Sequence, residues 1–276
     1  MGDSTFTTTS LIHGNELTSY KVNREIYAKN KEYNHFYFPI CNPYGFKKNI
    51  RVHPTMGDLN RNPTTKSYSF KKMLDDFISK SDFYIDLHSW NKRSEKFILV
   101  NKIKDNVIGE KKAQEVKKRI ITFSKLTGLP LIVDTRGDTG HLIEKSIIEK
   151  GIPSVIIECG GHHVDDSTAR RLSDKILNGL ECLSENSYDS YDKIYRRKYL
   201  YSEMLGDIIP NYNEGEPIEK GEVICSIDNG NKRKEIICNE SGWVTAFNSS
   251  LKITSSFREI CHFAVESDSD CLYSSN

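Results

Sequence analysis

The sequence of 276 residues contains no run of about 18 apolar residues, the length that a transmembrane helix needs. Residues 1–10 are polar and lack the apolar core of a secretory signal, so we expect no export signal. These two absences favour a cytoplasmic protein.

Net charge is also nearly absent, because 39 Lys and Arg residues offset 38 Asp and Glu residues. Such a surface does not attract nucleic acid or an anionic membrane. The basic run at 111–118 is typical of a solvated helix face. We expect neither kind of partner, and the sequence leaves the oligomeric state open.

The sequence has no Cys-x-x-Cys pair, and its seven cysteines stand at wide spacings. An odd number of cysteines without an export signal indicates reduced thiols inside a cell. We interpret them as small buried or incidental residues, with a regulatory or structural disulfide as the alternative.

Short apolar runs alternate with polar helical stretches over the first two-thirds of the chain. This alternation predicts an α/β fold with a mixed, mostly parallel sheet flanked by helices. The predicted strands cover residues 6–12, 34–41, 82–87, 97–101 and 154–158. The predicted helices cover residues 16–30, 68–79, 107–127, 140–149 and 167–184, the last capped by Asp165, Asp166 or Ser167.

The pattern changes after residue 184, where a polar stretch at 185–193 reads as a linker. Short strand-like pieces follow, separated by Gly, Asn and Pro, at residues 199–204, 222–227, 235–238 and 242–247. We therefore predict a catalytic domain at residues 1–187 and a small all-β domain without helices at 194–276. Residues 267–276 are expected to form a frayed tail.

Four polar motifs follow predicted strands, and in open parallel sheets the carboxyl ends of the strands line the ligand crevice. The first motif is His13-Gly14-Asn15-Glu16, in which a histidine and a carboxylate at a strand-to-helix turn could bind one metal ion. Gly14 would allow the tight turn between them. The alternative is an exposed helix start, with Glu16 at the positive end of the helix dipole.

The second motif is Asp86-Leu87-His88, whose period of two places Asp86 and His88 on one side of a strand. His88 would be a third metal ligand, with Asp86 as a hydrogen-bond acceptor behind it, unless it is an ordinary interior histidine. Two neighbouring ligands and a distant third are typical of catalytic zinc, which keeps one position open for water. We expect one Zn²⁺ per chain, although cobalt or manganese would also fit these ligands.

Glu158 ends the apolar run Ile156-Ile157 and precedes Cys159-Gly160-Gly161. Burial of an unpaired carboxylate is costly, so its presence at the end of a buried strand needs a reason. A general base beside an activated water is one reason, and pairing with an arginine or lysine is the alternative.

The fourth motif is the string Asn42-Pro43-Tyr44-Gly45-Phe46, then Arg51, then Asp58-Leu59-Asn60-Arg61. Arg61 could hold a substrate carboxylate through paired hydrogen bonds, and Asn60 adds an amide donor. Arg51 could stabilise the oxyanion that forms at an attacked carbonyl. The alternative for each arginine is plain solvent exposure.

The order of these motifs over residues 5–185 resembles the succinylglutamate desuccinylase/aspartoacylase family, which is related to the zinc carboxypeptidases. The resemblance implies zinc on His13, Glu16 and His88, catalysis by Glu158, and substrate binding by Arg51, Asn60 and Arg61. It also implies a small β domain after the mixed sheet. The stretch 215–222 is similar to the C-terminal domains of that family and to lipoyl-type sandwiches, but no lysine stands in a carrier hairpin.

The resulting hypothesis is a zinc-dependent amide hydrolase for a small N-acyl amino acid, in which Glu158 moves the protons and Arg51 polarises the carbonyl with zinc. Arg61 and Asn60 would hold the substrate carboxylate. A zinc carboxypeptidase acting on peptides is the nearest rival. Alternatives from other classes are a non-catalytic binding protein on the same scaffold and a carrier or interaction module in residues 194–276.

Overall fold

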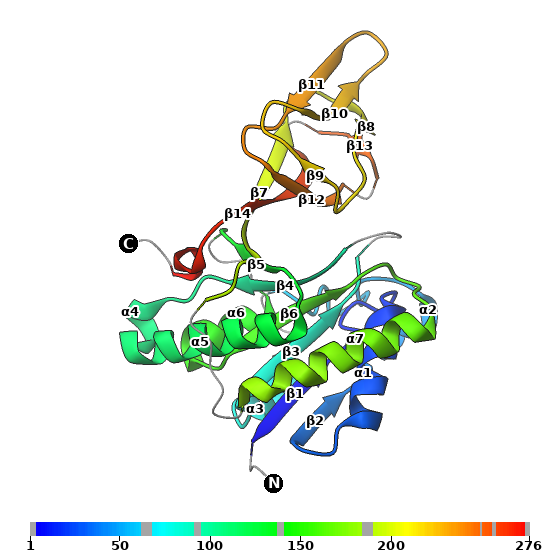
Figure 1. The fold of residues 1–276 in the computed structure, drawn as a ribbon. Coiled ribbons are helices and arrows are strands. Elements are labelled where there is room, and N and C mark those ends of the chain that lie inside the picture. The colour runs from blue at the N-terminus through cyan, green and yellow to red at the C-terminus, as the bar shows by residue number, and fades with distance from the viewer. Residues whose placement is uncertain are drawn as a thin grey trace.

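The computed structural model describes residues 4–61, 68–90, 95–136, 141–183, 190–248, 250–255 and 258–273. Its main feature is a ten-stranded sheet that ends in a small lobe of C-terminal strands (Figure 1). In spatial order the strands are β2 (Asn34–Phe38), β1 (Thr5–Thr9), β3 (Phe83–His88), β6 (Ser154–Cys159), β4 (Lys96–Asn101), β5 (Leu131–Asp134), β7 (Ile194–Ser202), β14 (Arg258–Glu266), β12 (Gly242–Phe247) and β9 (Pro217–Ile218).

The sheet is mixed and mostly parallel in its first part. Strands β2, β1, β3 and β6 run parallel, β4 runs antiparallel to β6, and β5 and β7 run parallel to β4. The pairs that follow β7 are antiparallel. A second, antiparallel sheet contains β11 (Arg233–Ile237), β10 (Val223–Asp228), β8 (Gly206–Pro210) and β13 (Lys252–Ile253). The predicted fold class is therefore confirmed.

Helices cover both faces of the main sheet, as the alternation along β2 shows. Tyr37 stacks on Tyr27 of one helix, whereas Phe36 and Phe38 contact Phe77 of another. The first face carries α1 (Leu17–Lys29), α7 (Asp166–Gly179) and α5 (Glu110–Thr127), which contact one another in that order. The opposite face carries α3 (Tyr68–Ile78) and α6 (Leu142–Lys150), which are joined by the ion pair between Asp75 and Lys145.

Several short elements depart from the prediction. Helix α2 (Pro43–Lys48) was not predicted, and its start is capped by the Asn42 side chain, which accepts a hydrogen bond from Gly45 N at 2.9 Å. Gly109 divides the predicted helix 107–127 into α4 (Asp105–Ile108) and α5. Helix α7 is capped by Asp165 and continues as the 3-10 helix η1 (Leu180–Leu183). Residues 137–140 and 184–189, on which parts of the predicted helices and linker fall, lie outside the described residues.

The frayed tail predicted for residues 267–276 is wrong as far as Tyr273. The chain forms the 3-10 helix η2 (Ser269–Leu272), and Leu272 is fully buried. Ile103 N donates a hydrogen bond to Leu272 O at 2.7 Å. The prediction of a β domain without helices is wrong for the same segment.

The junction between the first part of the chain and the C-terminal strands positions the site described below. The main sheet crosses the predicted domain boundary, because β7 pairs with β5 and β14 pairs with β7. The C-terminal strands also bury a second apolar cluster of their own around Ile224, Ile227 and Phe263. The division at residues 187 and 194 stays a prediction. No helix within the described ranges is long and apolar enough to span a membrane.

Candidate active site

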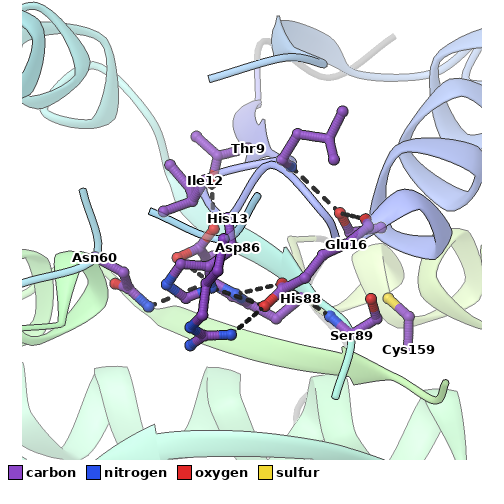
Figure 2. Close-up of polar contacts among 12 residues, drawn as sticks. Thr9, Ile12, His13, Glu16, Asn60, Asp86, His88, Ser89 and Cys159 are labelled. Atoms are coloured by element: carbon purple, nitrogen blue, oxygen red, sulfur yellow. Dashed lines mark hydrogen bonds and ion pairs between the residues drawn. The ribbon is translucent and has the colours of Figure 1, made fainter. Parts of the chain in front are cut away.

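The three predicted metal ligands come together at the carboxyl ends of β1 and β3. His13, Glu16 and His88 are buried, and one ligand atom from each lies within 4.8 Å of the others. His13 Nδ1 lies 2.8 Å from Glu16 Oε1, and His88 Nδ1 lies 2.9 Å from Glu16 Oε2 (Figure 2). Because β1 and β3 are adjacent parallel strands, the two sequence motifs meet at one edge of the sheet.

The turn that carries His13 and Glu16 depends on a close approach of two glycines. A Cβ atom added at Gly14 would lie 2.1 Å from the carbonyl carbon of Gly45, a distance that no real side chain allows. Gly14 N donates to Arg51 O at 3.1 Å, which ties the turn to the loop that follows α2. Position 14 therefore requires a glycine, because no side chain fits between this turn and Gly45.

The second ring nitrogen of each histidine faces a carboxylate. His13 Nε2 lies 3.1 Å from Asp58 Oδ1, and His88 Nε2 lies 3.0 Å from Asp86 Oδ2. A carboxylate that accepts the Nε2 proton fixes the tautomer and leaves Nδ1 as the ligand atom. This pairing was expected for Asp86 but was not assigned to Asp58, although Asp58 stands in the motif that supplied Asn60.

The charged groups of the cluster shift one another's pKa values. Burial would raise the pKa of Glu16, but the charges of His13 and His88 hold that pKa well below its usual range. Burial would lower the pKa of His88, but Asp86 and Glu16 raise it well above its usual range. Two imidazole Nδ1 atoms and the Glu16 carboxylate, with a further carboxylate behind each ring, form a set of ligands that suits a divalent cation.

Glu158 lies beside this cluster. It pairs in register with His88 across β3 and β6. Within the described part of the chain its Oε2 atom is buried and has no hydrogen-bond partner. Burial raises the pKa of Glu158, although the charge of His88 opposes this effect. Glu158 is therefore a half-buried residue with one buried, unpartnered carboxylate oxygen, as expected of a side chain that accepts a proton from a bound molecule.

The predicted substrate-binding residues also reach the cluster. Arg51 donates from NH1 to Glu16 Oε1 at 2.8 Å, and its guanidinium lies 5.5 Å from the Trp90 ring centroid. Asn60 Nδ2 lies 3.2 Å from His88 Nε2, and Asn60 Oδ1 accepts from Leu142 N at 3.0 Å. Arg61 donates from NH1 to the Asn60 carbonyl at 2.7 Å.

One pocket of about 220 Å³ unites the site. All seven residues predicted from the sequence line it: His13, Glu16, Arg51, Asn60, Arg61, His88 and Glu158. Its walls also contain residues that the sequence analysis did not identify: Trp90, Leu99, Arg136, His141, Ile156, Arg197, Glu259 and His262. We refer to this space as the active-site pocket.

Three of the missed residues come from the C-terminal strands, namely Arg197 on β7 and Glu259 and His262 on β14. Arg197 donates to Asp134 Oδ2 at 3.4 Å and also contacts His262 Nδ1. Burial and the charge of Arg197 lower the pKa of His262 to about 4, which keeps the ring neutral. The apolar run of residues 260–265, which His262 interrupts, was the signal that could have identified β14.

No protein-family model and no curated protein matches this sequence. Solved structures match it closely in fold. The product-bound ectoine utilization protein EutE (DoeB) of Ruegeria pomeroyi has a TM-score of 0.74 at 17% identity, over 96% of this chain and 86% of that one. A succinylglutamate desuccinylase/aspartoacylase of Rhodobacter sphaeroides gives the same values. An aspartoacylase family protein of Mesorhizobium loti has a TM-score of 0.75 at 17% identity, over 97% and 86%.

At this level of identity the likeness establishes the fold. The chain has the architecture of solved proteins that are named as succinylglutamate desuccinylases and aspartoacylases, as the motif order in its sequence implied.

Proposed function

We propose that this protein is a zinc-dependent hydrolase that cleaves the amide bond of a small N-acyl amino acid or a similar carboxylate-bearing molecule. One observation carries the proposal: both histidine Nδ1 atoms face Glu16, both Nε2 atoms face carboxylates, and the vacant Oε2 of Glu158 lines the same pocket. The names of the structural neighbours support the reaction class.

His13, Glu16 and His88 would hold the metal ion. Two imidazole nitrogens and one carboxylate are the ligands of many catalytic zinc sites. When bound, zinc would polarise the scissile carbonyl and lower the pKa of water.

Glu158 would take a proton from the attacking water at Oε2 and transfer it to the leaving nitrogen. Arg51 would donate to the carbonyl oxygen as negative charge develops there. Arg61 forms no ion pair among the described residues, although it feels the charge of Asp58. Its guanidinium lines the pocket and would bind the substrate carboxylate, with Asn60 beside it.

The dimensions of the pocket favour a small acyl amino acid over a peptide. A pocket of about 220 Å³ with walls from Arg197, Glu259 and His262 leaves little room for a chain on either side of the scissile bond. The carboxypeptidase alternative would need a longer groove.

The first experiment is elemental analysis of the purified protein. We expect about one zinc per chain in the wild type. The variant His88→Ala should hold little zinc, whereas His163→Ala, which changes an exposed histidine, should hold as much as the wild type. A wild-type protein that binds no zinc even after incubation with it would contradict the proposal and favour the non-catalytic binding protein.

The second experiment compares N-acetyl and N-succinyl amino acids with dipeptides that carry a free carboxylate. Release of free amine from the acyl amino acids, and none from the dipeptides, would support the proposed substrate class. The reverse result would identify a carboxypeptidase.

A further inference from the structure

Helix α3 carries a lysine where its pattern calls for an apolar residue. The buried residues of this helix are Lys71, Leu74 and Ile78, which lie on one face at helical spacing. Only 9% of Lys71 is exposed. Among the described residues Lys71 has no ion-pair partner, and burial lowers its pKa to about 8, although the charge of Asp58 opposes this effect. Burying an ammonium group without a partner is costly, so its position calls for an anion.

Lys71 lines a second cavity, of about 260 Å³, between α3 and α6. Leu74, Ile78 and Leu142 give this space an apolar wall. We call it the α3–α6 cavity. Arg61 also lines both this cavity and the active-site pocket, so one guanidinium lies between the two spaces.

The charges in the cavity wall limit the kind of ligand that it fits. Asp75 is already paired with Lys145 at 3.3 Å and with Lys150. Lys72 and Asp76 are exposed at the rim and balance each other in charge. Lys71 and Arg61 are then the positive charges that remain among the described residues of the wall. This arrangement suits a single small anionic group that is attached to an apolar stem.

We propose that the α3–α6 cavity binds a carboxylate carried on a short hydrocarbon stem, with Lys71 and Arg61 holding the carboxylate and Leu74, Ile78 and Leu142 contacting the stem. An inorganic phosphate lacks the stem and would leave the apolar wall of Leu74, Ile78 and Leu142 without a partner. The site needs no metal ion. Because Arg61 is shared, a ligand in this cavity would change the affinity of the active-site pocket for a substrate carboxylate, and the coupling would be reciprocal.

The test is calorimetric titration of the full-length protein with sodium hexanoate, with hexan-1-ol and inorganic phosphate as comparison ligands. We expect hexanoate to saturate about one site per chain and to bind more tightly than either comparison ligand. The affinity for hexanoate should be the same in untreated wild-type protein, in wild-type protein treated with EDTA and in the variant His88→Ala. Loss of binding after chelation would place the carboxylate on the metal instead and overturn the proposal.

Variants of Lys71 test whether this residue binds the carboxylate. Lys71→Met should weaken hexanoate binding about tenfold, the cost of one charged hydrogen bond, and Lys71→Arg should restore it to within about threefold. Lys111→Met, which removes an exposed lysine of α5, should bind hexanoate as the wild type does. Lys71→Gln provides a second charge-removing variant if Lys71→Met folds poorly. Unchanged affinity in either charge-removing variant would overturn the proposal.

Discussion

His88 and Glu158 occupy directly paired positions on the neighbouring parallel strands β3 and β6. The register of the sheet therefore sets the separation between a candidate metal ligand and the candidate base. A change of register between these strands would move Glu158 along the sheet and separate the two groups. The site consequently depends on strand pairing as much as on its loops.

The variant Glu158→Gln should retain about one zinc per chain and lose turnover by at least about a hundredfold, because an amide cannot accept the proton of water. Its thermal stability should not fall, since the change removes a buried carboxylate whose pKa burial has raised. Metal analysis, calorimetry and a deacylation assay on the same preparations measure these effects. A variant with most of its activity intact would show that another group moves the proton.

Asp58→Asn and Asp86→Asn should each weaken zinc binding by about 10- to 100-fold, because each replaces the charged acceptor that orients a histidine ring with a weaker, neutral one. Competition with a fluorescent chelator measures the affinity. The matched control is Asp76→Asn, which changes an exposed aspartate of α3 and should leave zinc affinity unchanged. Equal affinities in all three variants would remove Asp58 and Asp86 from the metal site.

Stability should fall as the pH decreases from about 6.5 toward 4, partly because of His35. Burial lowers the pKa of His35 from 6.5 to about 4 in the folded chain, where the ring stacks on Phe6 and its Nε2 lies 2.7 Å from Thr8 Oγ1. Between these two pH values the unfolded chain binds a proton that the folded chain does not, so acid favours unfolding. His35→Gln should show a smaller drop in Tm between pH 7 and pH 4.5. If the Tm of His35→Gln fell as far as that of the wild type, His35 would not contribute to the loss of stability in acid.

Lys71→Met should raise the Tm at pH 7 in the absence of ligand, because an apolar side chain replaces an ammonium group on the buried face of α3. The folded-state pKa of Lys71 is about 8, below its usual 10.5, so the wild-type lysine loses its charge more easily when folded. The wild type therefore gains stability as the pH rises through this window, and the advantage of the variant should shrink by about pH 10. A variant that is less stable at pH 7 would mean that Lys71 makes favourable contacts.

Gly14→Ala should lose both metal and stability, since its added Cβ would collide with the backbone of Gly45. Displacing this turn moves His13 and Glu16 together. Asn15→Ala, at the next position of the same turn, should retain the metal. Circular dichroism and zinc content on both variants separate a local displacement from a general loss of fold.

The residues His13, His88 and Glu158 could be predicted because each follows or ends a short apolar run, and such runs end at the carboxyl edge of a parallel sheet. Arg51, Asn60 and Arg61 lie in the loop after α2 and were identified from the order of the motifs along the chain. Strand β5 was missed because it has four residues and only residues 128–130 separate it from the end of α5. Strand β14 was missed because residues 260–265 are buried without interruption, and a bulge between Glu259 and Cys261 breaks the alternation that a half-buried strand shows. Arg197, Glu259 and His262 reach the pocket wall through the pairing of β7 with β5 and of β14 with β7. The local sequence pattern does not predict such long-range pairings.

The pairing of β14 with β7 also bears on how the protein is made. His13 lies near the start of the chain and His262 near its end, yet both line the same pocket. During synthesis from the N-terminus β14 leaves the ribosome long after β1 and β3, and only then can it complete the sheet. The nascent protein would therefore bring its metal ligands together first, with the pocket open to solvent, and would close the wall only once β14 has left the ribosome and paired with β7.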